Sequence, residues 1–240
     1  YNNRISIFDK NGCFLDCWGE KGSKKGQIHG PSGICIDLDN NLIVVDQFNN
    51  RIQKFSKEGK YLDSWGTQGN MEGQFNLPWG ISTSSKGEIL VADWRNDRVQ
   101  KFSSEGKVLG SFGIFNKSEH CFNRPSSAVQ DNDGFMYIAD WGNERIQILD
   151  SKGNHVQELK GESGLSVWAE EFFEANKDQA VARNKSNLEP EVDPEIKTPY
   201  EVSARIEKYF WGPASVKLDR NGNLLIVESN RHRIQVYSII

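Results

Sequence analysis

The stretch Val45-Asp46-Gln47-Phe48-Asn49-Asn50-Arg51-Ile52-Gln53-Lys54-Phe55 decides the fold, because similar stretches follow it at a constant spacing. They read Asp93-Trp94-Arg95-Asn96-Asp97-Arg98-Val99-Gln100 and Asp140-Trp141-Gly142-Asn143-Glu144-Arg145-Ile146-Gln147, each 47 residues after the one before. The same period of 47 is kept by further markers: Gly12, Gly59, Gly106 and Gly153; Trp18, Trp65 and Phe112; Pro31, Pro78 and Pro125. An internal repeat of this length indicates a solenoid, a propeller or an array of similar units.

Each repeat contains four short strand-like segments separated by turn signals. In the clearest repeat these segments are residues 33–36, 41–45, 51–55 and 61–65, and Lys57-Glu58-Gly59-Lys60 forms the last turn. Residues 51–55 alternate polar and apolar, as a half-buried strand does, and this period of two excludes a helical solenoid. The sequence therefore predicts an all-β fold, a β-propeller of four-stranded antiparallel blades.

One repeat carries an insertion. The next proline and arginine in phase, Pro213 and Arg233, each lie 88 residues after their predecessors, which is 41 more than one period. Both markers shift equally, so the extra residues lie after Gly153 and before Pro213. We place the insertion at residues 162–211, between two blades.

The insertion is predicted to be helical and acidic. Trp168, Phe172, Ala175 and Gln179 have helical spacing, and Thr198-Pro199-Tyr200-Glu201 is a capping box with proline at the first helical position. Residues 189–195 form an acidic linker between these two expected helices. Residues 162–211 hold 11 Asp+Glu and 6 Lys+Arg, a net charge of −5 against −4 for the whole chain. Whether the insertion covers the propeller or extends outward is left open.

The repeat resembles the NHL repeat, whose core is an aspartate, an asparagine and then arginine-isoleucine-glutamine. The run Gly73-Gln74-Phe75-Asn76-Leu77-Pro78-Trp79-Gly80-Ile81 fits the same family, and the resemblance covers essentially all of the chain outside the insertion. The last repeat departs from the pattern, with Glu228 for the aspartate and Arg231 for the asparagine. The resemblance implies a β-propeller, usually with six blades.

The chain contains too few repeats to form a closed ring of six blades. Residues 1–240 form a single domain of about 4.2 periods once the insertion is set aside, whereas six blades need about 282 residues. The chain begins and ends at a third strand, residues 4–8 and 233–239. We expect a fragment of a longer propeller; a smaller ring, or one completed by another chain, is the alternative. Open edges of this kind can pair with a further copy of the chain.

Composition excludes several classes of protein. The chain is 37% hydrophobic and 26% charged, which is typical of a soluble globular domain. Its apolar runs span four or five residues, far short of a membrane span, so no membrane partner is expected and the compartment is left open. The four cysteines offer no CxxC pair, and no P-loop or GxSxG motif is present.

Residues that recur in phase are assigned to the fold. The aspartates and arginines of the repeat core, such as Asp93 and Arg98, flank the turn between the second and third strands. We expect each carboxylate to pair with its arginine or to cap amides of the turn.

Residues that break the phase are candidates for function. The turn between the second and third strands and the segment between blades open on one face, and the insertion lands there too. This face collects aromatic and cationic residues of the types enriched at binding hot spots. They are Phe48, Trp79, Trp94, Arg95, Arg124, Trp141, Trp211 and Arg231. Packing between blades is the competing interpretation, above all for Trp79 and Trp211.

These residues predict a non-enzymatic scaffold without a cofactor. It would engage a protein or peptide, or a small ligand, through the face that carries the insertion. The first alternative is an RNA-binding NHL propeller, because tryptophan and arginine planes can stack on splayed bases. The negative charge of the chain and of the insertion argues against it.

The second alternative is a metal-dependent lyase of the amidating-lyase type. The resemblance implies it, since some propellers of this build hold a metal by histidines over the central channel. The candidate ligands are His29, His120 and His232, which strand direction places on the insertion face, with His155 on the opposite one.

Overall fold

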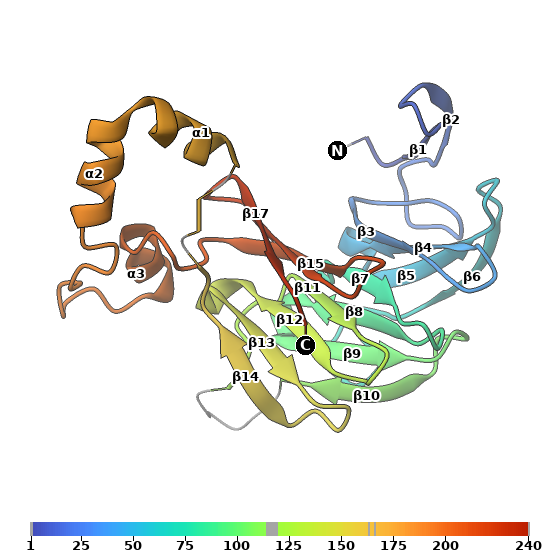
Figure 1. Ribbon diagram of the computed structural model, residues 1–240. Coiled ribbons are helices and arrows are strands. Elements are labelled where there is room, and N and C mark those ends of the chain that lie inside the picture. The colour runs from blue at the N-terminus through green and yellow to red at the C-terminus, as the bar shows by residue number, and fades with distance from the viewer. Residues whose placement is uncertain (1, 114–119, 163, 166, 240) are drawn as a thin grey trace.

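A computed structural model describes residues 2–113, 120–162, 164–165 and 167–239 of the chain (Figure 1). Most of its regular structure is antiparallel sheet. Two strands, β1 (Ile5–Phe8) and β2 (Phe14–Trp18), form the first sheet. The second contains β3 (Pro31–Ile36), β4 (Leu42–Asp46), β5 (Arg51–Phe55) and β6 (Tyr61–Trp65). The third contains β7 (Ile81–Thr83), β8 (Ile89–Asp93), β9 (Arg98–Phe102) and β10 (Val108–Phe112).

Two further sheets complete the described part of the chain. One contains β11 (Ser127–Gln130), β12 (Met136–Asp140), β13 (Arg145–Leu149) and β14 (His155–Leu159). The last contains β15 (Pro213–Leu218), β16 (Leu224–Glu228) and β17 (Arg233–Tyr237). Every sheet follows chain order with antiparallel neighbours, so the predicted four-stranded blades are confirmed. The prediction that each in-phase proline precedes an innermost strand also holds, because Pro31 and Pro213 begin β3 and β15 while Pro78 and Pro125 lie just before β7 and β11.

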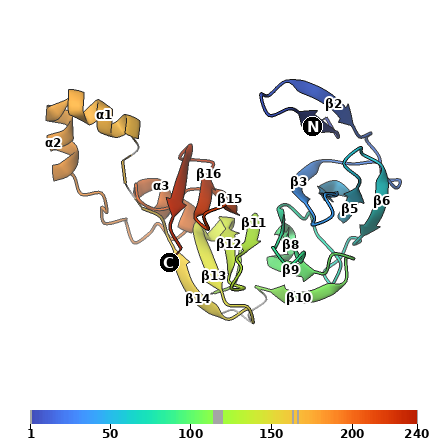
Figure 2. The same cartoon turned by 45° about the vertical axis from the view of Figure 1, so that its right-hand side comes forward.

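The sheets are arranged around a common axis. The inner strands β3, β7, β11 and β15 contact one another in that order. Figure 2 shows the blades as an arc, with the N-terminal and C-terminal sheets at its two ends. The second and third strands pair in the same register in each complete blade, so that Asp46 lies opposite Arg51 and Asp93 opposite Arg98.

The hydrophobic core lies between neighbouring blades. Ile43 and Val45 of β4 and Ile52 of β5 pack with Ile81 and Val91 of the next blade. All five residues of β8 are buried, because a blade covers each side of its sheet. Full burial of such side chains contributes about 1.5–3 kcal/mol each, so the packing of blades against one another supplies most of the stabilisation.

The phase-locked glycines and aromatics form pairs across three of the blade junctions. Trp18 covers the β5–β6 turn, where a Cβ on Gly59 would lie 2.5 Å from its ring. The same relation joins Trp65 to Gly106, at 2.7 Å, and the corresponding Phe112 to Gly153. These glycines have positive φ, and an L side chain there would both strain the turn and displace the aromatic ring. Two of the sequence periodicities therefore describe one contact.

The insertion contains three helices where two were predicted. They are α1 (Val167–Ala175), α2 (Lys177–Lys185) and α3 (Pro199–Arg205). The first predicted helix is interrupted at Asn176, whose backbone is non-helical and whose side-chain amide donates to the Phe172 carbonyl, 2.8 Å away. Asparagine competes with helical hydrogen bonding in this way. Residues 163 and 166 of the predicted insertion lie outside the described residues.

The two parts of the insertion have different positions. The capping box is confirmed, because the Thr198 hydroxyl accepts the Glu201 amide at 3.3 Å at the start of α3. Helix α3 contacts the turn η3 (Trp141–Asn143), whereas α1 and α2 extend away from the blades (Figure 1). No helix in the described ranges is long and apolar enough to cross a membrane.

Candidate binding face

The face where the turns η1 (Gln47–Asn49), η2 (Trp94–Asn96) and η3 meet the segments entering the inner strands is called the loop face. The two kinds of segment are joined by backbone hydrogen bonds. The Phe48 amide donates to the His29 carbonyl at 3.1 Å, and the Arg95 amide donates to the Asn76 carbonyl at 3.1 Å. The prediction that both open on one face is therefore confirmed.

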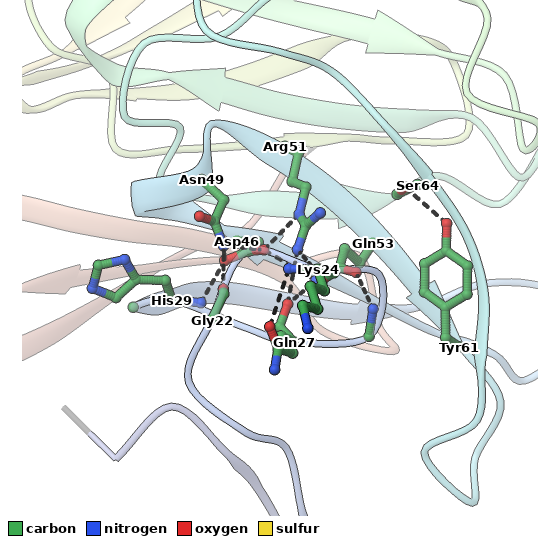
Figure 3. Close-up of polar contacts among 12 residues, drawn as sticks. Gly22, Lys24, Gln27, His29, Asp46, Asn49, Arg51, Gln53, Tyr61 and Ser64 are labelled. Atoms are coloured by element: carbon green, nitrogen blue, oxygen red, sulfur yellow. Dashed lines mark hydrogen bonds and ion pairs between the residues drawn. The ribbon is translucent and has the colours of Figure 1, made fainter.

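A buried polar network fixes each turn of the loop face, and Figure 3 shows the network of the β3–β6 blade. In the β3–β6 blade, Asp46 is fully buried and accepts the His29 amide at 2.6 Å, Arg51 Nε at 2.7 Å and Gln53 Nε2 at 3.0 Å. Asn49 also donates to this carboxylate, at 2.9 Å. The ion pair and the turn cap that the sequence predicted are both present, and they share one aspartate.

The same network recurs around Asp93 and Asp140. Arg98 Nε lies 2.7 Å from Asp93 Oδ2, and Arg145 Nε lies 2.9 Å from Asp140 Oδ2. Burial raises the pKa of Asp93, and the hydrogen bonds from Asn76, Asn96 and Arg98 oppose that rise. Sequence reasoning missed the glutamines of the repeat core. They are fully buried and donate to the aspartates: Gln53, Gln100 and Gln147. Their recurrence at 47 residues was the signal that could have identified them.

A second set of side chains links each blade to the next, and the sequence analysis did not predict it. Asn50, Asp97 and Glu144 have left-handed φ angles of 51°, 51° and 55°. Their side-chain oxygens accept the amides of Leu77 at 2.7 Å, Arg124 at 2.7 Å and Gly212 at 2.5 Å. These links hold the backbone of the loop face before any ligand arrives.

The third of these links differs in its chemistry. Glu144 is buried, and its pKa is raised to about 7, chiefly by that burial and further by the nearby Glu228 carboxylate. The Gly212 amide opposes the shift. A carboxyl group that titrates near neutral pH therefore lies at the junction between the last two blades.

Four of the predicted binding residues form one cluster, which we call the Trp94 cluster. The rings of Trp79 and Trp94 have centroids 6.0 Å apart, and the guanidinium carbons of Arg95 and Arg124 lie 5.6 and 5.0 Å from the Trp94 ring centroid. Trp79 is 41% exposed, Trp94 is half-buried, and both arginines are exposed. The cluster thus presents aromatic surface and two cations to solvent.

The other predicted residues lie in separate places. Phe48 contacts His29, with ring centroids 5.0 Å apart. Trp211 contacts Tyr200 of α3 at 5.5 Å and lies beneath Arg231 at 5.7 Å. Trp141 makes no ring–ring or cation–π contact within the residues that the structure describes. The eight predicted residues therefore form several small groups and not one continuous site.

Arg231 has an internal role that the sequence did not predict. Its guanidinium donates to three backbone carbonyls of the insertion, at Ser203, Ile206 and Tyr209, with distances of 2.5, 2.7 and 3.1 Å. Arg231 was predicted to belong to the binding face, and these bonds show that it also holds α3 and the following segment against the last blade. Trp211 packs in the same junction, which agrees with the competing interpretation for that residue.

The candidate metal-binding histidines are dispersed. His120 stacks on His155, with ring centroids 3.7 Å apart and an interplanar angle of 15°. The prediction that these two lie on opposite faces is wrong, because the segment containing His120 passes beside the first residue of the outer strand β14. Among the described residues, no group of three or more His, Cys, Asp or Glu is placed to hold a metal ion.

Two cavities flank the loop face. One of about 500 Å³ lies between α3 and the β11–β14 blade, and its lining includes Glu144, Val202 and Tyr209. A second of about 230 Å³ lies among the inner strands, with Ser32, Trp79, Ser127 and Lys217 around it. Trp94, Arg95 and Arg124 line neither cavity, whereas Trp79 of the same cluster lines the second.

Comparison with solved structures supports the propeller fold. A streptogramin B lyase aligns with a TM-score of 0.55 and 16% identity over 100% of this chain and 63% of that one. Virginiamycin B lyase from Staphylococcus aureus gives 0.56 and 15%, over 99% and 64%. A Bacteroides thetaiotaomicron protein of unknown function gives 0.61 and 16%, over 99% and 54%. This chain therefore spans less than two thirds of each of these proteins, and the likeness shows the fold alone.

Sequence comparison identifies the repeat. No curated protein matches the chain. The NHL repeat model matches residues 75–102, which include the Asp93 network, and residues 210–237, which include its counterpart around Glu228. The chain therefore contains NHL repeats at residues 75–102 and 210–237, and its sheets are similar to the blades of β-propellers.

Proposed function

We propose that this chain is a non-enzymatic binding module that recognises a protein or peptide through the Trp94 cluster on its loop face. The observation that carries the proposal is the cluster itself, which combines two tryptophans with two exposed arginines. The backbone beneath it is held by hydrogen bonds within the protein, such as that from the Arg124 amide to Asp97. Tryptophan and arginine dominate the energy of protein interfaces when they are fixed in place before binding.

The shape of the cluster favours a macromolecular partner over a small ligand. Small-molecule sites are concave and bury most of the ligand. Three of the four residues of the Trp94 cluster line neither cavity described above, and Trp79 contributes to the cavity among the inner strands. An open aromatic surface instead suits a segment of another protein that lies across it.

The test compares two tryptophan variants on one set of displayed short peptides. The double substitution Trp79→Ala with Trp94→Ala removes the aromatic surface of the cluster. Trp168→Ala is the matched control, because Trp168 is 83% exposed on α1, away from the loop face. Peptides selected on the wild-type protein should bind the double variant at least about tenfold more weakly and should bind the control unchanged.

Other results would replace the proposal. Equal loss in both variants would mean that the loop face is not the binding site. Binding of single-stranded oligouridylate, with an affinity that falls steeply as salt increases, would favour the RNA reader. Metal-dependent turnover of a small substrate by the purified protein would favour the lyase. Circular dichroism of each variant controls for the fold.

A further inference from the structure

The two arginines of the Trp94 cluster differ from the other arginines of the loop face. Arg51, Arg98 and Arg145 each pair with a buried aspartate, and Arg231 is bound by carbonyls. Arg95 and Arg124, in contrast, have no carboxylate within 4.0 Å and no side-chain hydrogen bond among the described residues; their cation–π contacts with Trp94 are the interactions found there. These contacts use the charge of the guanidinium and leave its N–H groups available.

The backbone of Arg124 is held in an unusual conformation. Its φ is 52°, in the left-handed region that disfavours residues with a Cβ atom. Gly30, Leu77 and Gly212 occupy the equivalent place in the other blades, with φ of 64°, 49° and 71°. The Asp97 carboxylate holds the Arg124 amide at 2.7 Å, so the residue is fixed in this conformation. An arginine stands here where glycine would be less strained.

Arg95 is fixed from the opposite side of the cluster. Its amide donates to the Asn76 carbonyl at 3.1 Å, and the turn η2 beneath it is held by the buried Asp93 network. The two guanidinium groups thus come from different loops and meet at one indole ring. Ligand binding would not have to order either loop first, and this saves part of the entropic cost of association.

We propose that the Trp94 cluster is a carboxylate-binding site for an acidic segment of a partner protein. Aspartate or glutamate side chains of that segment pair with Arg95 and Arg124, and a neighbouring apolar side chain packs on Trp79. Arginine is suited to this task because its planar fork of donors matches a carboxylate in a bidentate pair. This inference rests on the proposed function and adds the chemistry of the partner.

An RNA partner fits the same residues less well. Base recognition on such a surface needs open aromatic faces, and both guanidinium groups already contact the Trp94 ring. The chain also has a net charge of −4, which opposes the approach of a polyanion over a wide surface. A peptide segment with one or two carboxylates carries less negative charge than RNA, so the net charge of the chain repels it less.

The experiment uses labelled short peptides in which two glutamates are separated by different numbers of leucines, each with a matched glutamine peptide. Fluorescence anisotropy measures their affinity for the whole chain. At least one glutamate peptide should bind about tenfold or more tightly than its glutamine partner, as expected for charge-assisted hydrogen bonds. The double substitution Arg95→Ala with Arg124→Ala should abolish that preference. Arg95→Lys with Arg124→Lys should retain only part of it, because lysine keeps the charge but loses the fork.

Arg220→Ala is the matched control. Arg220 is exposed on the β15–β16 turn, at the ends of the strands away from the loop face. Its removal lowers the net charge by one, against two in the double variant, and should leave the preference intact. If glutamate and glutamine peptides bind equally and both are lost with Trp79→Ala and Trp94→Ala, the carboxylate inference is overturned while the proposed function stands. If no glutamate peptide binds, or if oligouridylate alone binds and is lost in the arginine variants, the carboxylate inference is overturned as well.

Discussion

The junction between the third and fourth sheets and the junction between the last two sheets perform the same task with different residues. At the first, Asp97 accepts the Arg124 amide, and the network below it consists of Asp93, Asn96 and Arg98. At the second, which carries the insertion, Glu144 accepts the Gly212 amide, and the network contains Glu228, Arg231 and Arg233. Both junctions are closed by the same pattern of side-chain bonds.

The difference shows how a repeat accommodates an inserted segment. Glu228, in place of aspartate, still accepts the backbone amide of Trp211 at 2.9 Å and Gln235 Nε2 at 2.8 Å, so its carboxylate retains the network. Arg231, in place of asparagine, reaches farther than the amide it replaces and binds carbonyls of the insertion. The departures from the repeat pattern therefore attach the insertion to the propeller.

The largest effect is expected where the network is fully buried. Arg98 is 2% exposed and donates to Asp93 and to the carbonyls of Asn70, Met71 and Gln74 at 2.7–2.8 Å. Arg98→Ala would leave the buried Asp93 charge without its cation and three carbonyls without donors. We expect a loss of about 3 kcal/mol or more in the free energy of unfolding, measured by urea denaturation.

The corresponding change at the insertion junction should cost less. The Arg233 side chain is 25% exposed, and its bonds to the carbonyls of Lys208 and Tyr209 are long, at 3.3 and 3.4 Å. Arg233→Ala should therefore destabilise the chain by about 1–2 kcal/mol, since water can replace part of what is lost. Equal losses for the two substitutions would mean that the networks are equivalent and that burial does not distinguish the junctions.

The second prediction concerns the pH dependence of the Glu144 link. Because the pKa of Glu144 rises from an ordinary value of 4.5 to about 7 on folding, the folded chain retains a proton that the unfolded chain releases between these values. The stabilisation from this group is complete below about pH 4.5 and is lost as the pH rises through about 7. Glu144→Gln keeps an oxygen for the Gly212 amide and has no charge to bury. It should be more stable than the wild type at pH 8, by up to about 3 kcal/mol, and similar to it at pH 4.5.

Asp97→Asn is the control for this prediction. Asp97 accepts an amide in the same way but is exposed to water, so its neutralisation should leave the shape of the stability profile between pH 4.5 and 8 unchanged. Chemical denaturation at several pH values gives the profile of each variant. A Glu144→Gln profile parallel to that of the wild type would mean that folding does not raise the pKa of Glu144.

The comparison also explains what could be read from the sequence. The period of 47 predicted the strands and the shared face because each blade repeats the same contacts, such as Trp65 on Gly106. The period could not show how far apart residues of different blades lie on that face. Trp94 with Arg124 and Trp211 with Arg231 were therefore assigned to one site. It also could not show that His120 reaches the outer strand, since Gly26 and Gly73 hold the corresponding positions and carry no side chain that marks the place. The period identifies the residues that all blades share, whereas the candidate site consists of residues that differ from blade to blade.

The smallest of the expected effects tests whether Arg231 serves the insertion alone. Arg231→Ala removes the bonds to the carbonyls of Ser203, Ile206 and Tyr209 but leaves Glu228, Arg233 and Gln235 bonded to one another. We expect a loss of about 1 kcal/mol in global stability, together with faster hydrogen exchange of the α3 amides and unchanged exchange in the β7–β10 blade. Arg183→Ala is the matched variant, because it removes a bidentate ion pair with Glu207 within the insertion. It should speed hydrogen exchange in α2 more than in α3. Faster exchange in β16 and β17 after Arg231→Ala would show instead that this arginine supports the blade, and the distinction between the two junctions would then fail at this position.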